Sequence, residues 1–166
     1  MLARKCRYGG HCRKFYSVAQ HSVWVHDHLF IPEALLIVPS ENDLDTVRQL
    51  RLAALLHDAH EAYWGLGDII TPAKYLNPQL TELLKEHEAR IDQCIADRFG
   101  IPVALFHHPI VKSADKLALS TEKRDLMTQQ LWEENLPEPH MDDIVPLPMD
   151  EIILTFITRL LNCWTI

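Results

Sequence analysis

The sequence lacks the signals of several large classes of protein. No apolar run approaches the roughly 20 residues that a membrane-spanning helix needs. The first ten residues are basic and contain no apolar core, so they do not resemble a signal peptide. The four cysteines include no C-x-x-C pair, which argues against a zinc ribbon. We therefore expect a reduced, cytosolic protein with no membrane partner.

An excess of positive charge is also missing. The formal net charge is −7, so the chain as a whole has no attraction to nucleic-acid polymers, and a phosphate group must be bound by local basic residues. The 166 residues are enough for one domain with a substantial core, which we place at residues 1–166. Ten histidines are many for this length and favour metal chemistry.

Sustained period-two alternation is absent as well, so the sequence predicts an all-α fold, a compact bundle of five or six main helices. Apolar runs such as Leu35–Val38 are too short to build a sheet. Caps, glycines and prolines set the expected boundaries. Helices are expected from about Phe15 to Pro32, from Ser40 through His57-Asp58 toward Gly65 and Gly67, and from Asn77 to Gly100. Two more are expected from His107-His108-Pro109 onward and over Asp150–Trp164. A helical turn is expected at Thr71-Pro72 and a loop over Leu136–Pro148.

The stretch Leu52–Tyr63 is the most informative part of the chain. An apolar run ends in the adjacent pair His57-Asp58, and the carboxylate of Glu61 follows within one turn. On a continuous helix, His57 and Glu61 would lie on one face, with Asp58 beside them. A lone His-Asp pair is common by chance, and its simplest interpretation is a helix end that reaches solvent.

Two other predicted helices each place a ligand-type residue on an apolar face. His21 lies on the same face as Val18 and Val25, where a core histidine is the alternative interpretation. Asp115 lies among Val111 and Ala118, where a buried carboxylate needs a partner, and Lys or Arg is the alternative to a metal. Two imidazoles and two carboxylates suit Mn²⁺, Co²⁺, Fe²⁺, Zn²⁺ or Ni²⁺ and leave coordination positions for water and substrate.

The order His…His-Asp…Asp on helices resembles that of the HD-domain metal-dependent phosphohydrolases. Further motifs are similar to the subgroup that contains bacterial 5′-deoxynucleotidases and phage dATP triphosphohydrolases, over about residues 4–130. A helix that precedes the opening motif in relatives is expected to be shortened or absent, and the connection from Glu61 to Asp68 is longer than expected. The motifs are Arg7-Tyr-Gly-Gly-His-Cys-Arg-Lys-Phe-Tyr-Ser-Val-Ala-Gln-His21-Ser, His57-Asp-Ala-His-Glu61, Gly67-Asp-Ile-Ile-Thr-Pro-Ala-Lys74 and Ala114-Asp-Lys-Leu-Ala-Leu-Ser-Thr-Glu-Lys-Arg-Asp-Leu-Met127.

The resemblance implies the metal chemistry of the site. His21, His57, Asp58 and Asp115 would bind one divalent transition metal, with Co²⁺, Mn²⁺, Zn²⁺, Fe²⁺ and Ni²⁺ all open. Glu61 would take the proton of the attacking water or protonate the leaving group. The alternative role for Glu61 is a hydrogen-bond acceptor that holds a ligand in place. His60, His87, His107 and His108 are not expected to be ligands.

The resemblance also implies the substrate contacts. Lys74 would bind phosphate, although a lone lysine after Thr-Pro-Ala is usually solvated, and Arg7 would clamp phosphate or sugar. Tyr8 would pack against the sugar and leave no room for a 2′-hydroxyl, and Asp68 would accept from the 3′-hydroxyl. Gln20 would contribute to the pocket, although a surface glutamine is the more common case.

One further residue falls outside these contacts. Glu122, two turns beyond Asp115, is a candidate to orient Arg7 or Lys74.

These roles imply hydrolysis of 2′-deoxynucleotides in the cytoplasm of a bacterial cell or a phage-infected host. Removal of the 5′-phosphate from a monophosphate and release of tripolyphosphate from a triphosphate both stay open, and an adenine preference is suggested only by the phage relatives. The rival function is a non-catalytic nucleotide-binding or scaffold protein with a degenerate HD site. A homo-oligomer, dimer or hexamer, is expected, and the last helix would serve core packing or a subunit interface.

Overall fold

The computed structural model describes residues 1–32, 40–63, 65, 68–69, 74, 76–128 and 135–164. In these ranges the regular structure consists of five α-helices and four short 3-10 helices, with one isolated bridge between Cys6 and Ser17. The predicted all-α fold with five or six main helices is confirmed. The predicted turn at Thr71-Pro72 and the apolar run Leu35–Val38 lie outside the described residues.

Helix α1 (Val18–Asp27) is shorter than the sequence predicts at both ends. It begins after Ser17, whose hydroxyl accepts from the backbone N–H of Gln20 and satisfies one of the free donors of the first turn. It ends before His28, whose backbone N–H and ring Nδ1 both bond to the carbonyl of Trp24. The last turn is therefore closed by a side chain that follows it.

Helix α2 (Glu41–Leu56) begins with the predicted capping box, in which Ser40 and Asp43 each accept from the other's backbone N–H. The helix was expected to run to Gly65, and this was wrong. It ends at Leu56, and the chain passes through His57 and Asp58 into the 3-10 helix η4 (Ala59–Ala62).

The remaining α-helices follow the predicted caps. Helix α4 (Pro78–Phe99) begins after Asn77, whose side chain accepts from two backbone N–H groups, and ends at Gly100 in the left-handed region with φ 67°. Helix α5 (Pro109–Leu126) begins after His108. Helix α6 (Met149–Cys163) lies within one residue of the predicted bounds, and the described segment 135–148 before it contains no helix.

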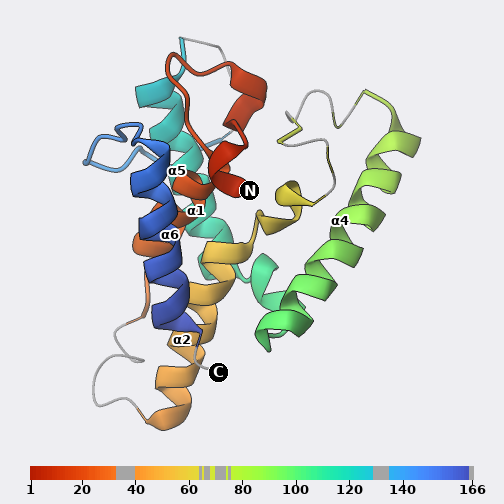
Figure 1. Ribbon diagram of the computed structural model, residues 1–166, viewed down its shortest axis with the longest axis vertical. Helices are drawn as coiled ribbons and strands as arrows, with labels where there is room; N and C mark the ends of the chain where they lie inside the picture. Colours follow the sequence, from red (N-terminus) through yellow and green to blue (C-terminus); the bar gives the residue numbers. More distant parts are fainter. Residues whose placement is uncertain are drawn as a thin grey trace.

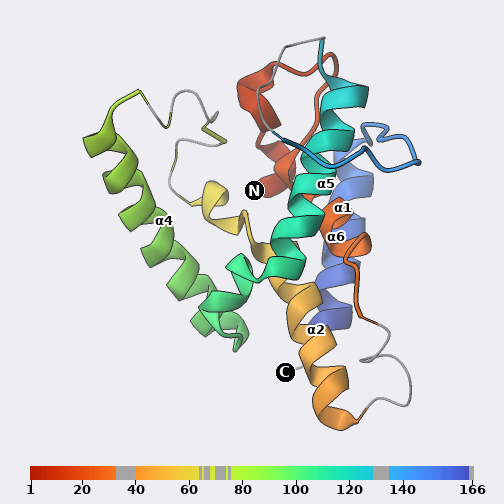
Figure 2. The ribbon, with the colours of Figure 1, turned by 180° about the vertical axis from the view of Figure 1, so that it is seen from behind.

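Helices α1, α2, α5 and α6 form the body of the molecule, as both ribbon views show (Figures 1 and 2). Helix α1 contacts α2, α5 and α6, whereas α4 stands apart and contacts the body mainly through η4 and η5 (Val103–His107). The N-terminal 3-10 helices η1 (Leu2–Arg4) and η2 (Arg7–Gly10) cross one end of the body. The main core lies between the helices and includes Val25, Leu52, Phe106, Val111 and Ala118.

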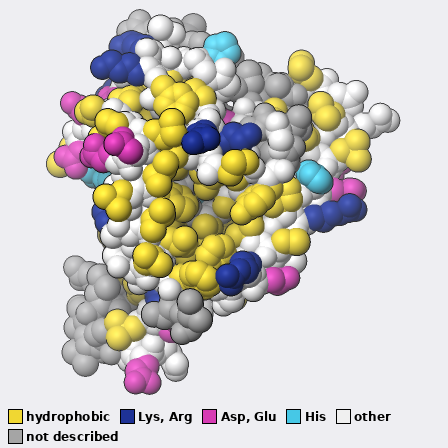
Figure 3. Space-filling model, viewed as in Figure 1, with side chains coloured by type: hydrophobic (Ala, Val, Ile, Leu, Met, Phe, Trp, Pro, Cys, Tyr) yellow, Lys and Arg dark blue, Asp and Glu magenta, His cyan; other side chains and the backbone are white. Residues whose placement is uncertain are grey.

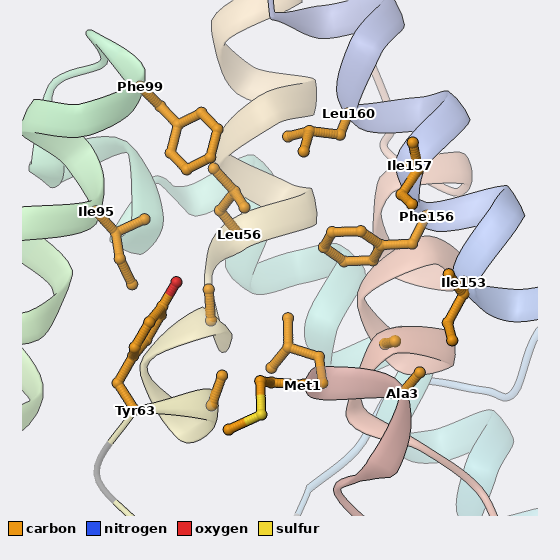
Figure 4. Close-up of a pocket in the computed structure, with 14 residues that line it drawn as sticks. Met1, Ala3, Leu56, Tyr63, Ile95, Phe99, Ile153, Phe156, Ile157 and Leu160 are labelled. Carbon is orange, nitrogen blue, oxygen red and sulfur yellow. The ribbon is translucent and has the colours of Figure 1, made fainter. Parts of the chain in front are cut away.

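Helix α6 buries one face and exposes the other. Ile152 and Cys163 are buried, whereas Leu154, Ile157 and Leu161 are exposed. Figure 3 shows apolar side chains gathered on the face of the molecule between α6 and α4. An apolar groove separates α6 from α4, with Leu56 between Phe99 and Phe156 (Figure 4). The described residues that line it include no histidine, cysteine or carboxylate side chain, so the groove is not the predicted metal site. The predicted homo-oligomer stays a prediction.

None of the helices in the described ranges combines the length and the apolar composition that crossing a bilayer requires.

Candidate metal centre

The end of α2 presents two adjacent side chains to the same point. Leu56 is the last helical residue, and Asp58 has φ −104° and ψ 14°, outside the α-helical region. The backbone then continues with i to i+3 bonds, of which Glu61 N–H to Asp58 carbonyl (3.2 Å) is the first. On a regular helix, adjacent side chains diverge by about 100°. The change of backbone conformation lets His57 and Asp58 converge instead.

The structure brings together all four residues predicted to bind metal. His21 Nε2 from α1 lies 3.3 Å from His57 Nε2, 3.5 Å from Asp58 Oδ2 and 3.3 Å from Asp115 Oδ1 of α5. His57 Nε2 lies 3.4 Å from Asp58 Oδ1 and 3.8 Å from Asp115 Oδ1. Within the described ranges, the ion pairs of Asp115 are with these two histidines, which differs from the Lys or Arg partner that was the alternative interpretation.

These separations fit one small divalent ion. Imidazole nitrogens and carboxylate oxygens lie about 2.0–2.2 Å from Zn²⁺, so two ligands of one ion are about 3.0–3.5 Å apart at octahedral or tetrahedral angles. His21, His57 and Asp58 also form a group whose ligand atoms all lie within 4.8 Å of one another. The residues could therefore hold a divalent metal, and the identity of that metal stays a prediction.

The second nitrogen of each histidine is bound so that Nε2 faces the cluster. His57 Nδ1 donates to the carbonyl of Ala54 at 2.8 Å. His21 Nδ1 lies 2.6 Å from Oε1 of Glu122, which is fully buried on α5. In both rings the Nδ1–H hydrogen bond leaves the Nε2 lone pair available, which is the usual arrangement of metal-binding histidines.

Glu122 also connects the cluster to the N-terminal segment. Arg7 Nη2 lies 3.4 Å from Glu122 Oε2, while Arg7 Nη1 lies 3.0 Å from Asp58 Oδ2. Burial raises the pKa of Glu122, but the charge of Arg7 and the hydrogen bonds from His21 and Tyr8 outweigh it and hold the pKa at about 2. Glu122 was a candidate to orient Arg7 or Lys74, and in the structure it contacts Arg7.

Tyr8 lies beside Arg7 in an unusual backbone conformation. It has φ 57° and ψ 30°, in the left-handed region that a residue with a side chain rarely occupies. The backbone N–H donates to Asp68, and the hydroxyl donates to Glu122. These two contacts fix Tyr8 and Asp68 next to the cluster. Their predicted contacts with a sugar stay predictions.

Glu61 is buried next to the cluster. Its side chain and those of Asp58 and His60 form a second group with ligand atoms within 4.8 Å. Its Oε2 has no hydrogen-bond partner among the described residues. Burial, together with the charges of Asp58 and Asp68, raises the pKa of Glu61 to about 8. A carboxyl group with such a pKa can hold or release a proton near neutral pH.

Lys74 faces the same region from the connection between η4 and α4. Its Nζ donates to Glu88 Oε1 of α4 at 3.0 Å. Burial lowers the pKa of Lys74, but the charge of Glu88, followed by those of Asp58 and Glu61, raises it above its ordinary value. Lys74 is therefore a cation whose field reaches the cluster, and a phosphate contact stays a prediction.

Gln20 bonds to the segment that precedes α6. Its Nε2 donates to the carbonyl of Val145 at 2.7 Å, and its Oε1 accepts from the N–H of Leu147 at 3.0 Å. The side chain thus ties α1 to the segment before α6. A role of Gln20 in the substrate pocket stays a prediction.

Sequence reasoning also missed two carboxylates of α4. Glu88 holds Lys74, and Asp92 Oδ1 lies 3.0 Å from His60 Nδ1. Both side chains lie on the amphipathic helix Pro78–Phe99, and Asp92 is buried. The available signal was their spacing of four residues, which places them on one face beside Leu84 and Ile95.

An all-helical domain in which two histidines and two aspartates from three segments meet beside a buried glutamate has the arrangement of the HD-domain class. The family model described as 5′-deoxynucleotidase YfbR-like matches residues 11–124. The match covers more than half of the chain, so the protein belongs to this HD-domain family. The resemblance stated from the motifs is confirmed, and family membership indicates a hydrolase of the 5′-deoxynucleotidase type.

Two curated relatives match the chain. The uncharacterized protein YfdR of Escherichia coli (strain K12) is 35% identical over 150 residues, which cover 88% of this chain and 70% of YfdR. An uncharacterized protein of Rhodobacter capsulatus is 34% identical over 114 residues, which cover 67% of this chain and 50% of that protein. No solved structure gives a significant match.

Proposed function

We propose that this protein is a metal-dependent phosphohydrolase that acts on 2′-deoxynucleotides, with water attacking the α-phosphorus. The observation that carries the proposal is the convergence of His21, His57, Asp58 and Asp115 next to the buried Glu61. A divalent metal held by the four residues supplies Lewis acidity, which lowers the pKa of water and polarises a phosphoryl oxygen.

Glu61 is the group that transfers the proton. It is close to Asp58, it is buried, and its raised pKa of about 8 suits proton exchange near neutral pH. Its Oε2, which makes no hydrogen bond with the described residues, is the atom that would take or give the proton. A carboxylate that served only to hold a ligand would be expected to bond to that ligand's ring or backbone.

Arg7 and Lys74 supply positive charge close to the cluster. Arg7 bonds to Asp58 and to Glu122, so its guanidinium is fixed at the edge of the site. Lys74 comes from the connection after η4 and is held by Glu88. A chain of net charge −7 needs such local cations to attract a nucleotide phosphate.

The length of the phosphate chain stays open between two reactions. Both present the same α-phosphate and sugar to the cluster, so the four ligands favour neither. Cations beyond the α-phosphate would favour a triphosphate, and Arg4, Lys5, Arg13 and Lys14 lie close in sequence to Arg7. Family membership favours the monophosphate, because the matching model is described as a 5′-deoxynucleotidase.

The test is a substrate panel on protein loaded with Co²⁺ or Mn²⁺. Deoxynucleoside monophosphates and triphosphates and their ribonucleotide counterparts are compared, and phosphate and tripolyphosphate are measured separately. We expect hydrolysis of deoxynucleotides that stops on chelation and is absent in Asp115→Ala. A metal-loaded protein that binds deoxynucleotides but hydrolyses none would overturn the proposal in favour of the non-catalytic binding protein.

Selection against the 2′-hydroxyl is expected to depend on the ring of Tyr8. Tyr8→Ala should raise kcat/KM for AMP relative to dAMP by on the order of 10–100-fold, because the space beside C2′ opens. Tyr8→Phe is the matched control, since it loses the bond to Glu122 and keeps the ring. Equal wild-type rates on dAMP and AMP would contradict the selection itself, and a preference that survives Tyr8→Ala would assign it to another residue.

A further inference from the structure

A second cluster of ligand-type side chains lies away from the metal centre. His28 follows the last residue of α1, and His140 and Asp142 belong to the segment between α5 and α6. Their ligand atoms all lie within 4.8 Å of one another. We propose that His28, His140 and Asp142 form a second site, for a divalent transition metal, that joins the end of α1 to the segment 135–148.

The nitrogen lone pairs are placed for such a site. His28 Nδ1 bonds to the carbonyl of Trp24 at 2.9 Å, and a carbonyl only accepts, so the proton is on Nδ1 and the lone pair on Nε2. His140 Nδ1 accepts from the backbone N–H of Asp142 at 3.2 Å, so its lone pair is on Nδ1, 3.6 Å from Asp142 Oδ2. A metal at this nitrogen would replace one long hydrogen bond.

The two rings have a relative position that one ion can bridge. The centroids of His28 and His140 are 4.7 Å apart and the ring planes meet at 76°. With metal–nitrogen distances of about 2.0–2.1 Å, two imidazoles on one ion have centroids roughly 4.5–5.5 Å apart. The ring centroids of His21 and His57 in the metal centre are 5.3 Å apart. The second pair therefore matches the first in spacing.

The side chains of the second cluster are held in place by the surrounding structure. Trp24 stacks on His28 with centroids 3.8 Å apart and an angle of 11°. The backbone of His140 donates to Thr121 at 3.0 Å and accepts from Arg124 at 2.7 Å. Binding an ion would not require ordering of a loose loop, so little conformational entropy would be lost.

The chemistry of the donors selects the class of ion. Two imidazoles and one carboxylate favour Zn²⁺, Ni²⁺, Co²⁺ or Cu²⁺ over Mg²⁺ and Ca²⁺, which prefer oxygen ligands. The two histidines are half-buried and Asp142 is exposed, so an ion can enter from solvent. Arg124 is the nearby cation, and it pairs with Asp125 and Asp143. The second site has three protein ligands, one fewer than the metal centre, so we expect it to bind metal with the lower affinity of the two.

The experiment is a titration of tag-free protein with Zn²⁺, followed by metal analysis, and with Ni²⁺, followed by tryptophan fluorescence. We expect two equivalents of Zn²⁺ in the wild type and one in His28→Ala and His140→Ala. His87→Ala is the matched control at an exposed histidine of α4, and it should keep both equivalents. Ni²⁺ should quench the fluorescence of Trp24, and Trp24→Phe should remove that part of the quenching.

Two further variants keep the test decisive. Asp142→Asn changes an exposed side chain and should weaken the second equivalent by at least roughly tenfold without unfolding the protein. Asp115→Ala should lose the first equivalent and keep the quenching of Trp24, which separates failure of the second site from failure of the metal centre. A single equivalent at saturating Zn²⁺, or a second equivalent that persists in both His28→Ala and His140→Ala, would overturn the proposal.

Discussion

Glu122 is the residue on which the contacts of the metal centre meet. It is fully buried, and it bonds to the ring of His21, the guanidinium of Arg7 and the hydroxyl of Tyr8. Its carboxylate stays ionised, because the charge of Arg7 and the hydrogen bonds from His21 and Tyr8 hold its pKa at about 2 despite burial. One side chain therefore sets the orientation of a predicted metal ligand and of two predicted substrate contacts.

Replacing Glu122 by Gln tests this role. The amide keeps the volume and an acceptor oxygen but removes the charge, so His21 loses the anionic acceptor that makes its Nε2 a better ligand. We expect metal affinity to fall by about 10–100-fold in a folded protein. Equilibrium binding with a competing chelator measures the effect, and Glu86→Gln at an exposed position of α4 is the control. Unchanged affinity would mean that Glu122 supports the fold only.

Glu61 is expected to act on protons and not on metal affinity. Glu61→Gln should lower kcat by roughly 10²–10⁴ while metal content and KM for a deoxynucleotide change little, because the amide cannot exchange a proton. Single-turnover kinetics and metal analysis on the same preparation measure both quantities. If the metal were lost along with activity, Glu61 would instead be a ligand, in line with its closeness to Asp58 and His60.

At the scale of elements, several site residues lie at or just beyond the ends of helices, whereas Asp115 and Glu122 lie within α5. His57 and Asp58 follow α2, His28 follows α1, and η2 brings Arg7 and Tyr8 against α5. The middles of the same helices supply the core. Helices α1 and α6 are joined by an ion pair in which Arg159 donates to Asp27 at 2.7 and 3.0 Å. Asp27 also bonds to the ring of His26 at 2.7 Å.

The Asp27 contact predicts a pH dependence of stability. Burial raises the pKa of Asp27, but the hydrogen bonds from His26 and Arg159 outweigh it and hold the pKa well below the ordinary value of 3.8. A carboxyl group with a depressed pKa stabilises the fold above its ordinary pKa and loses this contribution as the pH falls toward the folded-state value. The stabilisation from Asp27 is thus complete at neutral pH and decreases below about pH 4.

Asp27→Asn is therefore expected to lower the free energy of unfolding at pH 7 by up to about 1 kcal/mol, since the pair is partly exposed. The difference from the wild type should shrink steadily between about pH 4 and pH 2. Urea unfolding at several pH values measures it, with Glu86→Gln again as the control. A difference that is constant with pH would assign the effect to packing and not to charge.

At the scale of the whole molecule, the metal centre joins parts of the chain that are far apart in sequence. Helix α1 supplies His21, the end of α2 supplies the His57-Asp58 pair, and α5 supplies Asp115. The three helices pack side by side in the body. Without an ion, two carboxylates and two imidazoles would face one another at short range. An ion that binds only the folded chain adds its binding free energy to stability.

Removing the metal should lower the Tm. At a free metal concentration 100-fold above Kd the stabilisation is about 2.7 kcal/mol, which corresponds to roughly 5–10 °C for a chain of this size. Thermal unfolding with one equivalent of Mn²⁺ or with a chelator measures the shift. Asp115→Ala should show almost none, while Asp142→Asn should keep it. An equal shift in Asp115→Ala would show that the ion stabilises the fold from another place.

The sequence by itself determined much of the local structure. Ser40 with Asp43, Asn77 with Pro78, and Gly100 mark helix ends through contacts of neighbouring residues, and those ends were predicted. The family motifs predicted four metal ligands, and the structure brings these four side chains together. The match to the YfbR-like family confirms the resemblance.

Only the tertiary structure decided how α2 ends and which groups the polar side chains contact. Helix periodicity favoured continuation toward Gly65, but convergence of His57 and Asp58 on His21 and Asp115 requires the backbone to leave the helix at Asp58. The contacts of Gln20 with Val145 and of His28 with His140 cross more than a hundred residues of chain. Local spacing carries no information about such partners, because packing of α1 against the segment before α6 creates them.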